Sequence, residues 1–363
     1  MSLAILGMGT ANPPYAVAQH EALAVARALG GPELLDGAWL DSMYANSGVT
    51  TRRQVFARAI VEDAATGGRT TRSPWLPDAD GWRPPSTAER MATYAAEAAP
   101  LAIDAARQAL AAARVAAARI THLITVSCTG FAAPGVDVAL IGALALRPTV
   151  LRTHIGFMGC HGAINGLRVA QAFAADPAAT VLLAAVELCS LHYCYGPAAP
   201  DKLVANALFA DGAAALVGRH GDGAWRVDAT ASCLFPDSER AMAWTVGDQG
   251  FEMTLSKLVP KAIAARLRPW MDAWLAERNL SVEQIGSWAI HPGGPKILAA
   301  AEDALGLPPA ATAAARAVFA ELGNMSSPTV LFIIDRLRRA DAPRPCVALG
   351  FGPGLVAEAA LLL

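Results

Sequence analysis

Residues 156–163 read GFMGCHGA and place Cys160 between glycines, where one apolar run gives way to another. The preceding residues, VLRTHIGFMG, predict a strand, and the following ones, AINGLRVAQAFAA, predict a helix. We therefore expect Cys160 at a helix N-terminus, where unpaired N–H groups and the helix dipole favour a thiolate. The alternative is a small buried hydrophobic residue, because free cysteine is among the most buried residue types.

Short apolar runs and longer helical runs alternate along the rest of the chain. The runs of strand length are THLITVS, TVLLAAVEL, GAAALVG, SWAIH and CVALGFG. The helical runs span 86–118, 161–175, 201–209, 256–278, 295–305 and 326–339. Ser86 with Glu89, and Ser281 with Gln284, have the spacing of capping boxes, and the Gly- and Pro-rich segment 66–85 predicts a loop. The alternation predicts an α/β protein with mostly buried strands.

The length and composition predict two closely packed halves. The chain has 363 residues, of which 54% are hydrophobic and 17% are charged. Glycines and charges near 218–226 place the boundary, so that the halves cover 1–220 and 221–363. The strand-like stretches ITHLITVSCTG and IGSWAIHPGG, one in each half, both end in a polar residue and glycine. This similarity is weak evidence for a duplication.

Charge and cysteine usage exclude several classes of protein. The net charge is -2 and there is no long Lys/Arg block, so the sequence contains no basic stretch of the kind that binds nucleic acid or an anionic membrane. None of the six cysteines forms a C-x-x-C pair, which argues against a zinc cage. No apolar run approaches the ~18 residues that a membrane helix needs. The N-terminus lacks a basic region before its apolar run, so we expect a first strand and a cytoplasmic protein with reduced thiols.

A reactive cysteine needs partners, and two residues are candidates. His291 ends an apolar strand and precedes Pro-Gly-Gly, a turn that leaves the imidazole at the strand tip. Asn324 follows Gly323 and precedes Ser-Ser-Pro, residues typical of a helix start. An asparagine in this setting is often only a cap or turn residue.

Five motifs occur in a defined order: MGCHGA, NALFADGAAALV, IHPGGPKIL, GNMSSPTVLF and ALGFGPGLVAE. In this order and spacing, the chain resembles chalcone synthase and the other type III polyketide synthases, within the thiolase-like condensing enzymes. The resemblance runs from GMGTANPP to the C-terminus. It implies a five-layered αβαβα fold made of two similar halves, and a homodimer.

The resemblance also assigns roles to four residues. It implies that Cys160 is the nucleophile, that His291 and Asn324 are its partners, and that Phe209 is a gatekeeper at the cavity. An imidazolium at His291 would stabilise the thiolate of Cys160, which takes an acyl group from coenzyme A. N–H donors of His291 and Asn324 would then hold the enolate formed from malonyl-CoA. No metal or organic cofactor is required.

Several cavity positions differ from those of the plant enzymes. Ala133 stands where a methionine crosses into the partner subunit, and Trp244 stands where a glycine is usual. Cys128, Cys189 and His192 each replace a threonine. The predicted cavity comprises Cys128, Ala133, Cys189, His192, Trp244, Met253, Ser326 and Pro353. These differences resemble the bacterial members, whose products include pyrones, resorcinols and naphthols.

The cations that grip coenzyme A are also altered. Trp39, Ser42 and Asn46 occupy positions where the family usually has Lys or Arg. The remaining nearby cations, and therefore the expected contacts to coenzyme A, are Arg52, Arg53 and Lys296. Because fewer cationic residues are available to bind coenzyme A, loading from an acyl carrier protein is an alternative to loading from an acyl-CoA.

Two other functions compete with the iterative synthase. A ketoacyl synthase III shares Cys, His and Asn but condenses once, whereas the stretch 350–354 (GFGPG) and the Phe209 motif favour the polyketide synthase. A non-catalytic scaffold that binds acyl-CoA is the third possibility. The starter unit, the number of extensions and the mode of ring closure depend on the volume of the cavity, which motifs do not specify.

Overall fold

The structure is a computed structural model that describes residues 2–30, 37–77, 83–196 and 200–363. Its centre is a nine-stranded mixed sheet with the strand order β11-β12-β13-β8-β1-β7-β6-β4-β5. The N-terminal half supplies β1, β4, β5, β6 and β7, and the C-terminal half supplies the other four strands. The halves join where β1 pairs with β8, through Leu3 with Val227 and Ala4 with Arg226.

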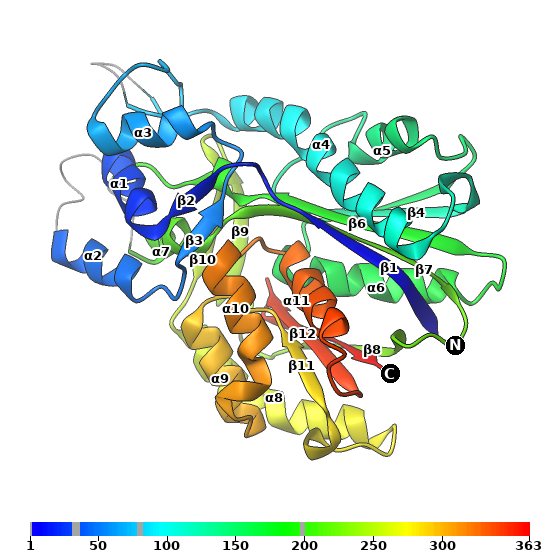
Figure 1. The fold of residues 1–363 in the computed structure, drawn as a ribbon. Helices are drawn as coiled ribbons and strands as arrows, with labels where there is room; N and C mark the ends of the chain where they lie inside the picture. The colour runs from blue at the N-terminus through cyan, green and yellow to red at the C-terminus, as the bar shows by residue number, and fades with distance from the viewer. Residues whose placement is uncertain (1, 31–36, 78–82, 197–199) are drawn as a thin grey trace.

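Three strands of the N-terminal half, β1, β6 and β7, are long and mostly buried, whereas β5 is short and partly exposed. The strands of this half are β1 (Leu3–Ala11), β4 (His122–Ser127), β5 (Leu151–Gly156), β6 (Thr180–Leu188) and β7 (Asp211–His220). All nine residues of β6 are buried, which agrees with its continuous apolar sequence. The outer face is covered by α4 (Thr87–Ala113), which contacts β1, β6 and β7, and by α5 (Val136–Leu144) (Figure 1).

The C-terminal half repeats the arrangement with fewer strands. It contains β8 (Arg226–Leu234), β11 (Ser287–Ile290), β12 (Cys346–Gly352) and β13 (Val356–Leu362), with β11 parallel to β12. The outer face carries α8 (Leu258–Ala276), α9 (Pro295–Leu305) and α10 (Ala313–Leu322). Figure 1 shows α8 and α9 on the side of the molecule opposite α4 and α5, with α10 between α9 and α11.

Two buried helices separate the halves. The helix α6 (Gly162–Phe173) contacts β4 and β6 on one side and β8, β12 and β13 on the other. The helix α11 (Pro328–Arg339) contacts β7 and β11, and its first eight residues are buried. The two parts of the sheet therefore form separate layers. The order is α4/α5, the N-terminal part of the sheet, α6/α11, the C-terminal part of the sheet, and α8/α9/α10, which is the thiolase-like α/β arrangement expected from the sequence (Figure 1).

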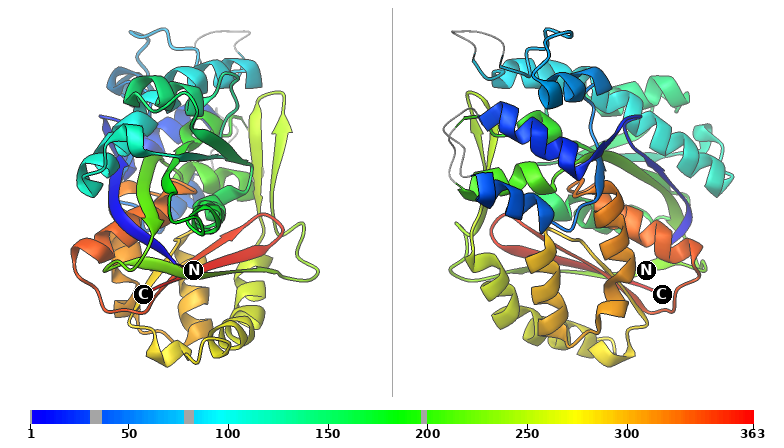
Figure 2. Two further views of the ribbon diagram at one scale, coloured as in Figure 1. Left: turned by 90° about the vertical axis from the view of Figure 1, so that its right-hand side faces the viewer. Right: turned by 60° about the vertical axis from the view of Figure 1, so that its left-hand side comes forward.

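The remaining elements lie beside these layers. They are β2 (Ala16–Ala18), α1 (Gln19–Gly30), α2 (Gly37–Ala45), β3 (Thr51–Arg53), α3 (Arg58–Thr66), α7 (Pro200–Leu208), β9 (Met242–Gly247) and β10 (Gly250–Leu255). Strands β9 and β10 form a hairpin that stands at the side of the central sheet (Figure 2). This hairpin carries Trp244 and Met253, which face each other across the pair.

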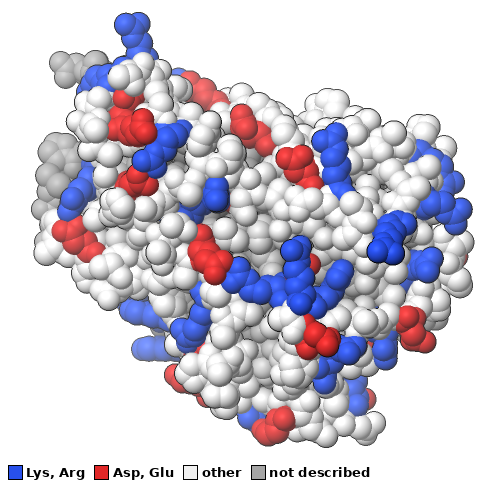
Figure 3. Space-filling view, in the orientation of Figure 1, with Lys and Arg blue, Asp and Glu red and all other residues white. Residues whose placement is uncertain are grey.

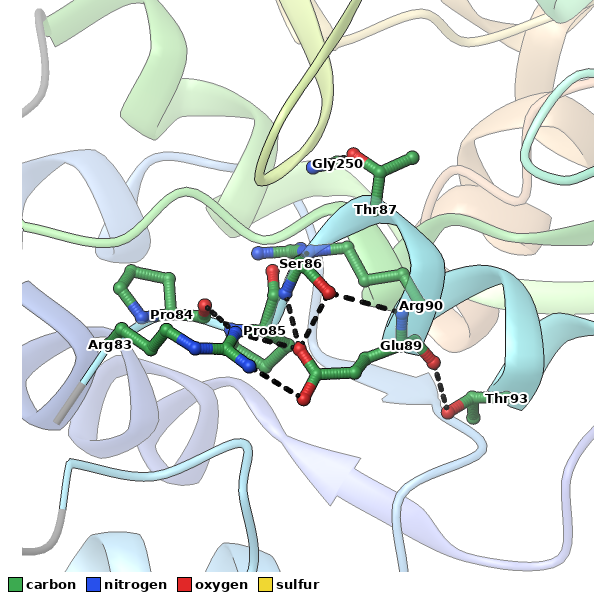
Figure 4. Close-up of polar contacts among 9 residues, drawn as sticks. All are labelled: Arg83, Pro84, Pro85, Ser86, Thr87, Glu89, Arg90, Thr93 and Gly250. Atoms are coloured by element: carbon green, nitrogen blue, oxygen red, sulfur yellow. Dashed lines mark hydrogen bonds and ion pairs between the residues drawn. The ribbon is translucent and has the colours of Figure 1, made fainter.

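Every predicted strand corresponds to a strand of the structure, including the one before Cys160 and the first strand at the N-terminus. All six predicted helical runs also correspond to helices. The capping box at Ser86 is present: the Ser86 N–H donates to Glu89 Oε2 (2.7 Å) and the Glu89 N–H donates to Ser86 Oγ (3.3 Å) (Figure 4). Of the predicted loop 66–85, residues 78–82 lie outside the described part of the chain, and Thr66 is the last residue of α3.

On the face shown in Figure 3, Lys and Arg side chains are interspersed with Asp and Glu, so this face is neither predominantly positive nor predominantly negative. In the part of the chain that the structure describes, no helix is both long and apolar enough to cross a membrane.

Candidate active site

Cys160 lies in a tight turn between β5 and α6. The turn, Gly159–His161, is a single turn of 3-10 helix that leads directly into α6, which confirms the predicted place at a helix N-terminus. Gly159 has a φ of +73°, and a Cβ on it would lie 2.5 Å from Pro353 Cδ. Only glycine fits this position, so the GFGPG stretch at the end of β12 packs directly against the turn that holds the nucleophile.

The structure brings His291 and Asn324 to the same cavity as Cys160. His291 follows β11, and its N–H donates to the Leu349 carbonyl (2.7 Å). Asn324 lies between α10 and α11. These residues and Phe209 line one small cavity of about 10 Å³, together with Met242, Met253, Leu255, Gly293, Ile297 and Phe351. The four residues that the sequence singles out thus meet at the interface between the two halves.

Buried, unpartnered nitrogens mark this cavity. The Ser326 N–H donates to Asn324 Oδ1 (2.8 Å), which orients the amide and leaves Nδ2 without a partner among the described residues. Both ring nitrogens of His291 also lack a hydrogen-bond partner within that part of the chain. His291 is 1% exposed and Asn324 is fully buried. Since such groups are rare in folded proteins, the amide and the imidazole are available to an oxygen that enters the cavity.

Burial sets the protonation of the nucleophile and of His291. Burial raises the pKa of the Cys160 thiol to about 11, against a smaller lowering by its contact with Ser326, whose Oγ lies 3.6 Å from Sγ. Burial lowers the pKa of His291 to about 3, and the nearby His161 lowers it further. Both shifts favour a neutral thiol and a neutral imidazole over the thiolate–imidazolium pair expected from the sequence, because the desolvation of each charge outweighs its compensation.

A larger cavity of about 240 Å³ adjoins the first one. Phe209 and Met253 line both, and Cys189, His192 and Trp244 line the larger one, as the sequence predicts for cavity residues. The indole of Trp244 meets the His192 ring edge-on at 5.7 Å, and the ring of Phe251 stacks on His192 at 4.3 Å. An acyl group on Cys160 would therefore extend past Phe209 and Met253 toward an aromatic wall.

His192 is held as one neutral tautomer. Its Nε2–H donates to the Thr129 carbonyl (2.7 Å), and its Nδ1 accepts from the Phe251 N–H (3.0 Å). Burial lowers the pKa of this imidazole to about 4, against a smaller opposing effect of the bond to Thr129. Protonation at Nδ1 would break the bond from Phe251, so the geometry keeps the ring uncharged.

A buried carboxylate that the sequence analysis did not single out holds the other side of the nucleophile. Glu187 accepts hydrogen bonds from Thr129 Oγ1 (2.7 Å), Ser327 Oγ (2.6 Å) and the N–H of Cys128 (2.9 Å). Cys128 Sγ lies 3.5 Å from the Oγ of Ser326, which also contacts Cys160. Glu187 thereby fixes Cys128 and Ser327, and with them the hydroxyl of Ser326 that contacts the reactive sulfur.

His161, next to the nucleophile, is a further residue that the sequence analysis did not assign. It is 2% exposed, and its Nδ1 lies 2.8 Å from Asn165 Oδ1. Asn165 Nδ2 donates to Glu358 Oε1 (3.0 Å), and Glu358 forms an ion pair with Arg168. Because a carboxylate only accepts, the amide must present its oxygen to His161, so that Nδ1 carries the proton. The network ties the turn of Cys160 to β13.

The structure does not bring all the predicted residues into the site. Arg52 is fully buried, and its guanidinium donates to the carbonyls of Asn206 (2.7 Å) and Phe209 (3.0 Å). The expectation that Arg52 binds coenzyme A is corrected, because its donors hold the end of α7 and the residue after it. Ala133 is exposed next to a cis peptide bond to Pro134 and lines neither cavity in this chain.

The other two predicted contacts to coenzyme A, Arg53 and Lys296, are accessible to solvent. Arg53 donates to the Pro14 carbonyl (2.7 Å), and Lys296 is exposed in the first turn of α9, close in sequence to His291. Among the described residues, no group of three or more His, Cys, Asp or Glu side chains is placed to hold a metal ion.

Comparisons with known proteins agree with this geometry. Residues 3–221 match the family described as chalcone and stilbene synthases, N-terminal domain, and residues 226–363 match the C-terminal domain of the same family. The structure of PKS-I from the brown alga Ectocarpus siliculosus superposes with a TM-score of 0.91 at 32% identity, covering 99% of this chain and 98% of that chain.

Curated relatives include bacterial enzymes. The chain is 38% identical over 256 residues to 1,3,6,8-tetrahydroxynaphthalene synthase of Streptomyces peucetius subsp. caesius, which covers 68% of each protein. It is 34% identical over 257 residues to the alpha-pyrone synthesis polyketide synthase-like Pks18 of Mycobacterium tuberculosis, covering 68% of this chain and 65% of that protein. The chain therefore belongs to the chalcone and stilbene synthase family and is a type III polyketide synthase.

Proposed function

We propose that this enzyme repeatedly condenses malonyl-CoA with an acyl group held as a thioester on Cys160, and that the product then cyclises to a small pyrone, resorcinol or related aromatic compound. The observation that supports this most directly is the pair of unpartnered, buried donors, His291 and Asn324, beside the Cys160 sulfur. The printed names of the relatives, a tetrahydroxynaphthalene synthase and an alpha-pyrone synthase-like protein, favour the same products.

The first step loads the starter. The Cys160 sulfur attacks the carbonyl of the acyl-CoA, and neutral His291 accepts the thiol proton as the carbon–sulfur bond forms. The bond to coenzyme A breaks, and its thiolate takes the proton back from His291. The acyl group is left on Cys160, and both side chains of the pair are again neutral.

The second step forms the nucleophile. Malonyl-CoA loses carbon dioxide, and the electrons of the broken carbon–carbon bond become an enolate whose oxygen accepts from Asn324 Nδ2 and from an N–H of His291. One such donor is commonly worth about 2.7–4 kcal/mol. Phe209, buried in the cavity wall, presents an apolar surface that favours neutral carbon dioxide over the charged carboxylate.

The third step extends the chain. The enolate carbon attacks the acyl carbonyl, the bond to Cys160 breaks, and the sulfur takes up a proton. The product is a ketoacyl-CoA that is longer by one acetate unit and can load again. The larger cavity next to Phe209 and Met253 gives such a chain room to grow before ring closure.

Product analysis tests this proposal. The enzyme is incubated with malonyl-CoA and a panel of short, aromatic and long-chain starters, each supplied as the acyl-CoA and as the acyl carrier protein thioester, and the products are identified by mass spectrometry. Ring-containing products with several acetate units are expected. A single ketoacyl thioester with every starter would instead indicate a ketoacyl synthase III, and no product with any starter from CoA or carrier protein would indicate a scaffold.

We also propose that the chain works as a homodimer. β5 is an edge strand of the sheet, and exposed apolar side chains lie on it and near it: Leu151, Phe131, Met158 and Val138. An unpaired, apolar edge is a template for pairing with a second strand. Light scattering on the purified protein checks this, and Leu151→Lys should shift the dimer toward monomer if β5 is the contact.

A further inference from the structure

Arg90 carries an uncompensated charge in the interior. It lies in the first turn of α4 beside the capping box and is fully buried (Figure 4). Its Nε donates to the Pro85 carbonyl (2.9 Å), and its Nη1 donates to the carbonyls of Leu191 and Tyr193. All of these acceptors are neutral. Its Nη2 has no hydrogen-bond partner in the described part of the chain.

The neighbouring carboxylate does not neutralise Arg90. Glu89 is occupied by Arg83, at 2.8 and 3.0 Å, and by the backbone N–H of Ser86 (Figure 4). The guanidinium carbon of Arg90 instead lies over the rings of Trp75 (5.6 Å to the centroid) and Tyr195 (5.3 Å). Such cation–π contacts compensate only part of the cost of burying a charge.

Arg90 forms part of the wall of the larger cavity of about 240 Å³. The charged residues of that wall are Arg90, Lys202 and Glu252, and Lys202 forms an ion pair with Glu252. His192 adds no charge, because its Nδ1 accepts from the Phe251 N–H. Among the described lining residues, the cavity therefore has one excess positive charge, which is that of Arg90.

The cavity also lies on the path of the acyl chain. It shares Phe209 and Met253 with the cavity of Cys160, and Trp244 packs on the cluster that contains Cys160. We infer that this cavity binds a carboxylate at the far end of the acyl group, with Arg90 as the counter-ion. The preferred starter is then a dicarboxylic acyl thioester. This inference rests on the proposed function.

Matched starters test the inference on the unaltered enzyme. Glutaryl-CoA and pentanoyl-CoA have the same chain length and differ at the far end, where one has a carboxylate and the other a methyl group. We expect kcat/KM for starter-dependent product to be about ten-fold or more higher with glutaryl-CoA, as for a charged hydrogen bond. Equal values, or a preference for pentanoyl-CoA, would overturn the inference while leaving the condensation itself established.

A variant then assigns the preference to Arg90. Arg90→Gln should lower the ratio of glutaryl to pentanoyl kcat/KM toward one, and Arg90→Lys should retain part of it. Arg83→Gln is the matched control, because Arg83 is an exposed arginine paired with Glu89 outside the cavity. A folded Arg90→Gln enzyme with the original ratio would contradict the assignment. Circular dichroism and a thermal melt establish that the variant is folded.

A binding measurement keeps the test independent of folding and of turnover. Free glutarate should slow the alkylation of Cys160 by iodoacetamide in the unaltered enzyme more than pentanoate does, and high salt should weaken this protection. If no starter is extended but glutarate still protects, the condensation proposal fails and the carboxylate site stands. If neither acid protects and glutaryl-CoA is not preferred, the carboxylate site is refuted.

Discussion

The backbone of Asn324 is paired with that of Phe209 in an isolated parallel β-bridge. The Asn324 N–H donates to the Leu208 carbonyl (2.8 Å), and the Ala210 N–H donates to the Asn324 carbonyl (2.8 Å). These bonds need neither side chain. The end of α7 and the segment between α10 and α11 therefore place the amide of Asn324 and the ring of Phe209 relative to each other through the main chain.

Because the bridge is formed by the backbone, Asn324→Ala should remove one donor to the enolate without moving the site. The loss of one such donor costs about 2.7–4 kcal/mol, so decarboxylation of malonyl-CoA should slow by about 10²–10³-fold. Release of carbon dioxide from labelled malonyl-CoA measures the rate, and a thermal melt checks the fold. A loss of less than about ten-fold in a folded variant would contradict the role of Asn324.

Cys160→Ala should abolish condensation and retain decarboxylation, because the enolate is held by His291 and Asn324. The measurement pairs carbon dioxide release with mass spectrometry of products from an acyl-CoA starter. Cys233→Ala is a suitable control, since Cys233 is a half-buried free cysteine of β8 that lines neither cavity. Extension of a starter by the Cys160→Ala variant would show that the acyl group is carried elsewhere.

The neutral Cys160–His291 pair predicts slow alkylation of the resting enzyme. With the pKa of Cys160 raised to about 11, the thiolate fraction at neutral pH falls below that of a free thiol, whose pKa is about 8.5. The rate of labelling by iodoacetamide should therefore rise about ten-fold per pH unit and continue to rise above pH ~9. Peptide mass spectrometry distinguishes Cys160 from the other free cysteines. A rate that is already maximal near pH 7 would instead establish the ion pair that the motif predicts.

The sequence predicts best those elements whose local pattern agrees with their final environment. Strands such as β6 and β12 are buried along their whole length, so their apolar runs are unambiguous. The run Val356–Leu362 (VAEAALL) contains three Ala, two Leu and one Glu, all of which favour helices. It is nevertheless the strand β13, because β8 and β12 pair with it on either side. That pairing depends on contacts across the sheet, which a local pattern does not contain.

The active-site residues show the same difference between what a local sequence pattern contains and what only the fold determines. Motifs and their order predict Cys160, His291 and Asn324, because these residue types follow directly from the chemistry. Their protonation could not be predicted, since it depends on how completely the fold excludes water. For Arg52 the prediction is wrong: the sequence suggests a contact with coenzyme A, but the side chain is buried and donates to main-chain carbonyls. The link from His161 to Glu358 joins residues 197 positions apart and leaves no local signal.

His192 predicts a specific dependence of stability on pH. Its pKa is about 4 in the folded protein and about 6.5 in an unfolded chain, so the unfolded state binds the proton more tightly. Acid therefore favours unfolding, beginning as the pH falls below about 6.5 and ending near 4. Between pH 7 and pH 5, this group alone should lower the free energy of unfolding by about 2 kcal/mol.

Replacement of His192 isolates that contribution. Asp211 has the opposite effect, since burial raises the pKa of its carboxyl to about 6, so only a comparison of variants is informative. His192→Gln should reduce the loss of stability between pH 7 and pH 5, measured by urea unfolding at both pH values. His20→Gln, at an exposed histidine, is the control. An unchanged pH dependence in His192→Gln would mean that the imidazole is not held neutral by its two hydrogen bonds.

Trp244 should limit the size of the acyl chain. Its indole is half-buried on β9, lines the larger cavity and meets His192 and Phe251 edge-on, so it occupies space next to the path from Cys160. Trp244→Gly should lengthen the products or admit larger starters, and because the side chain is only half-buried, the loss of stability should be below the about 3–5 kcal/mol of a core tryptophan. Val246→Gly, an exposed position of the same strand, controls for the effect of glycine on the hairpin. Product mass spectra and thermal melts on the same preparations check both expectations, and a folded Trp244→Gly enzyme with an unchanged product spectrum for every starter would show that Trp244 does not set the length.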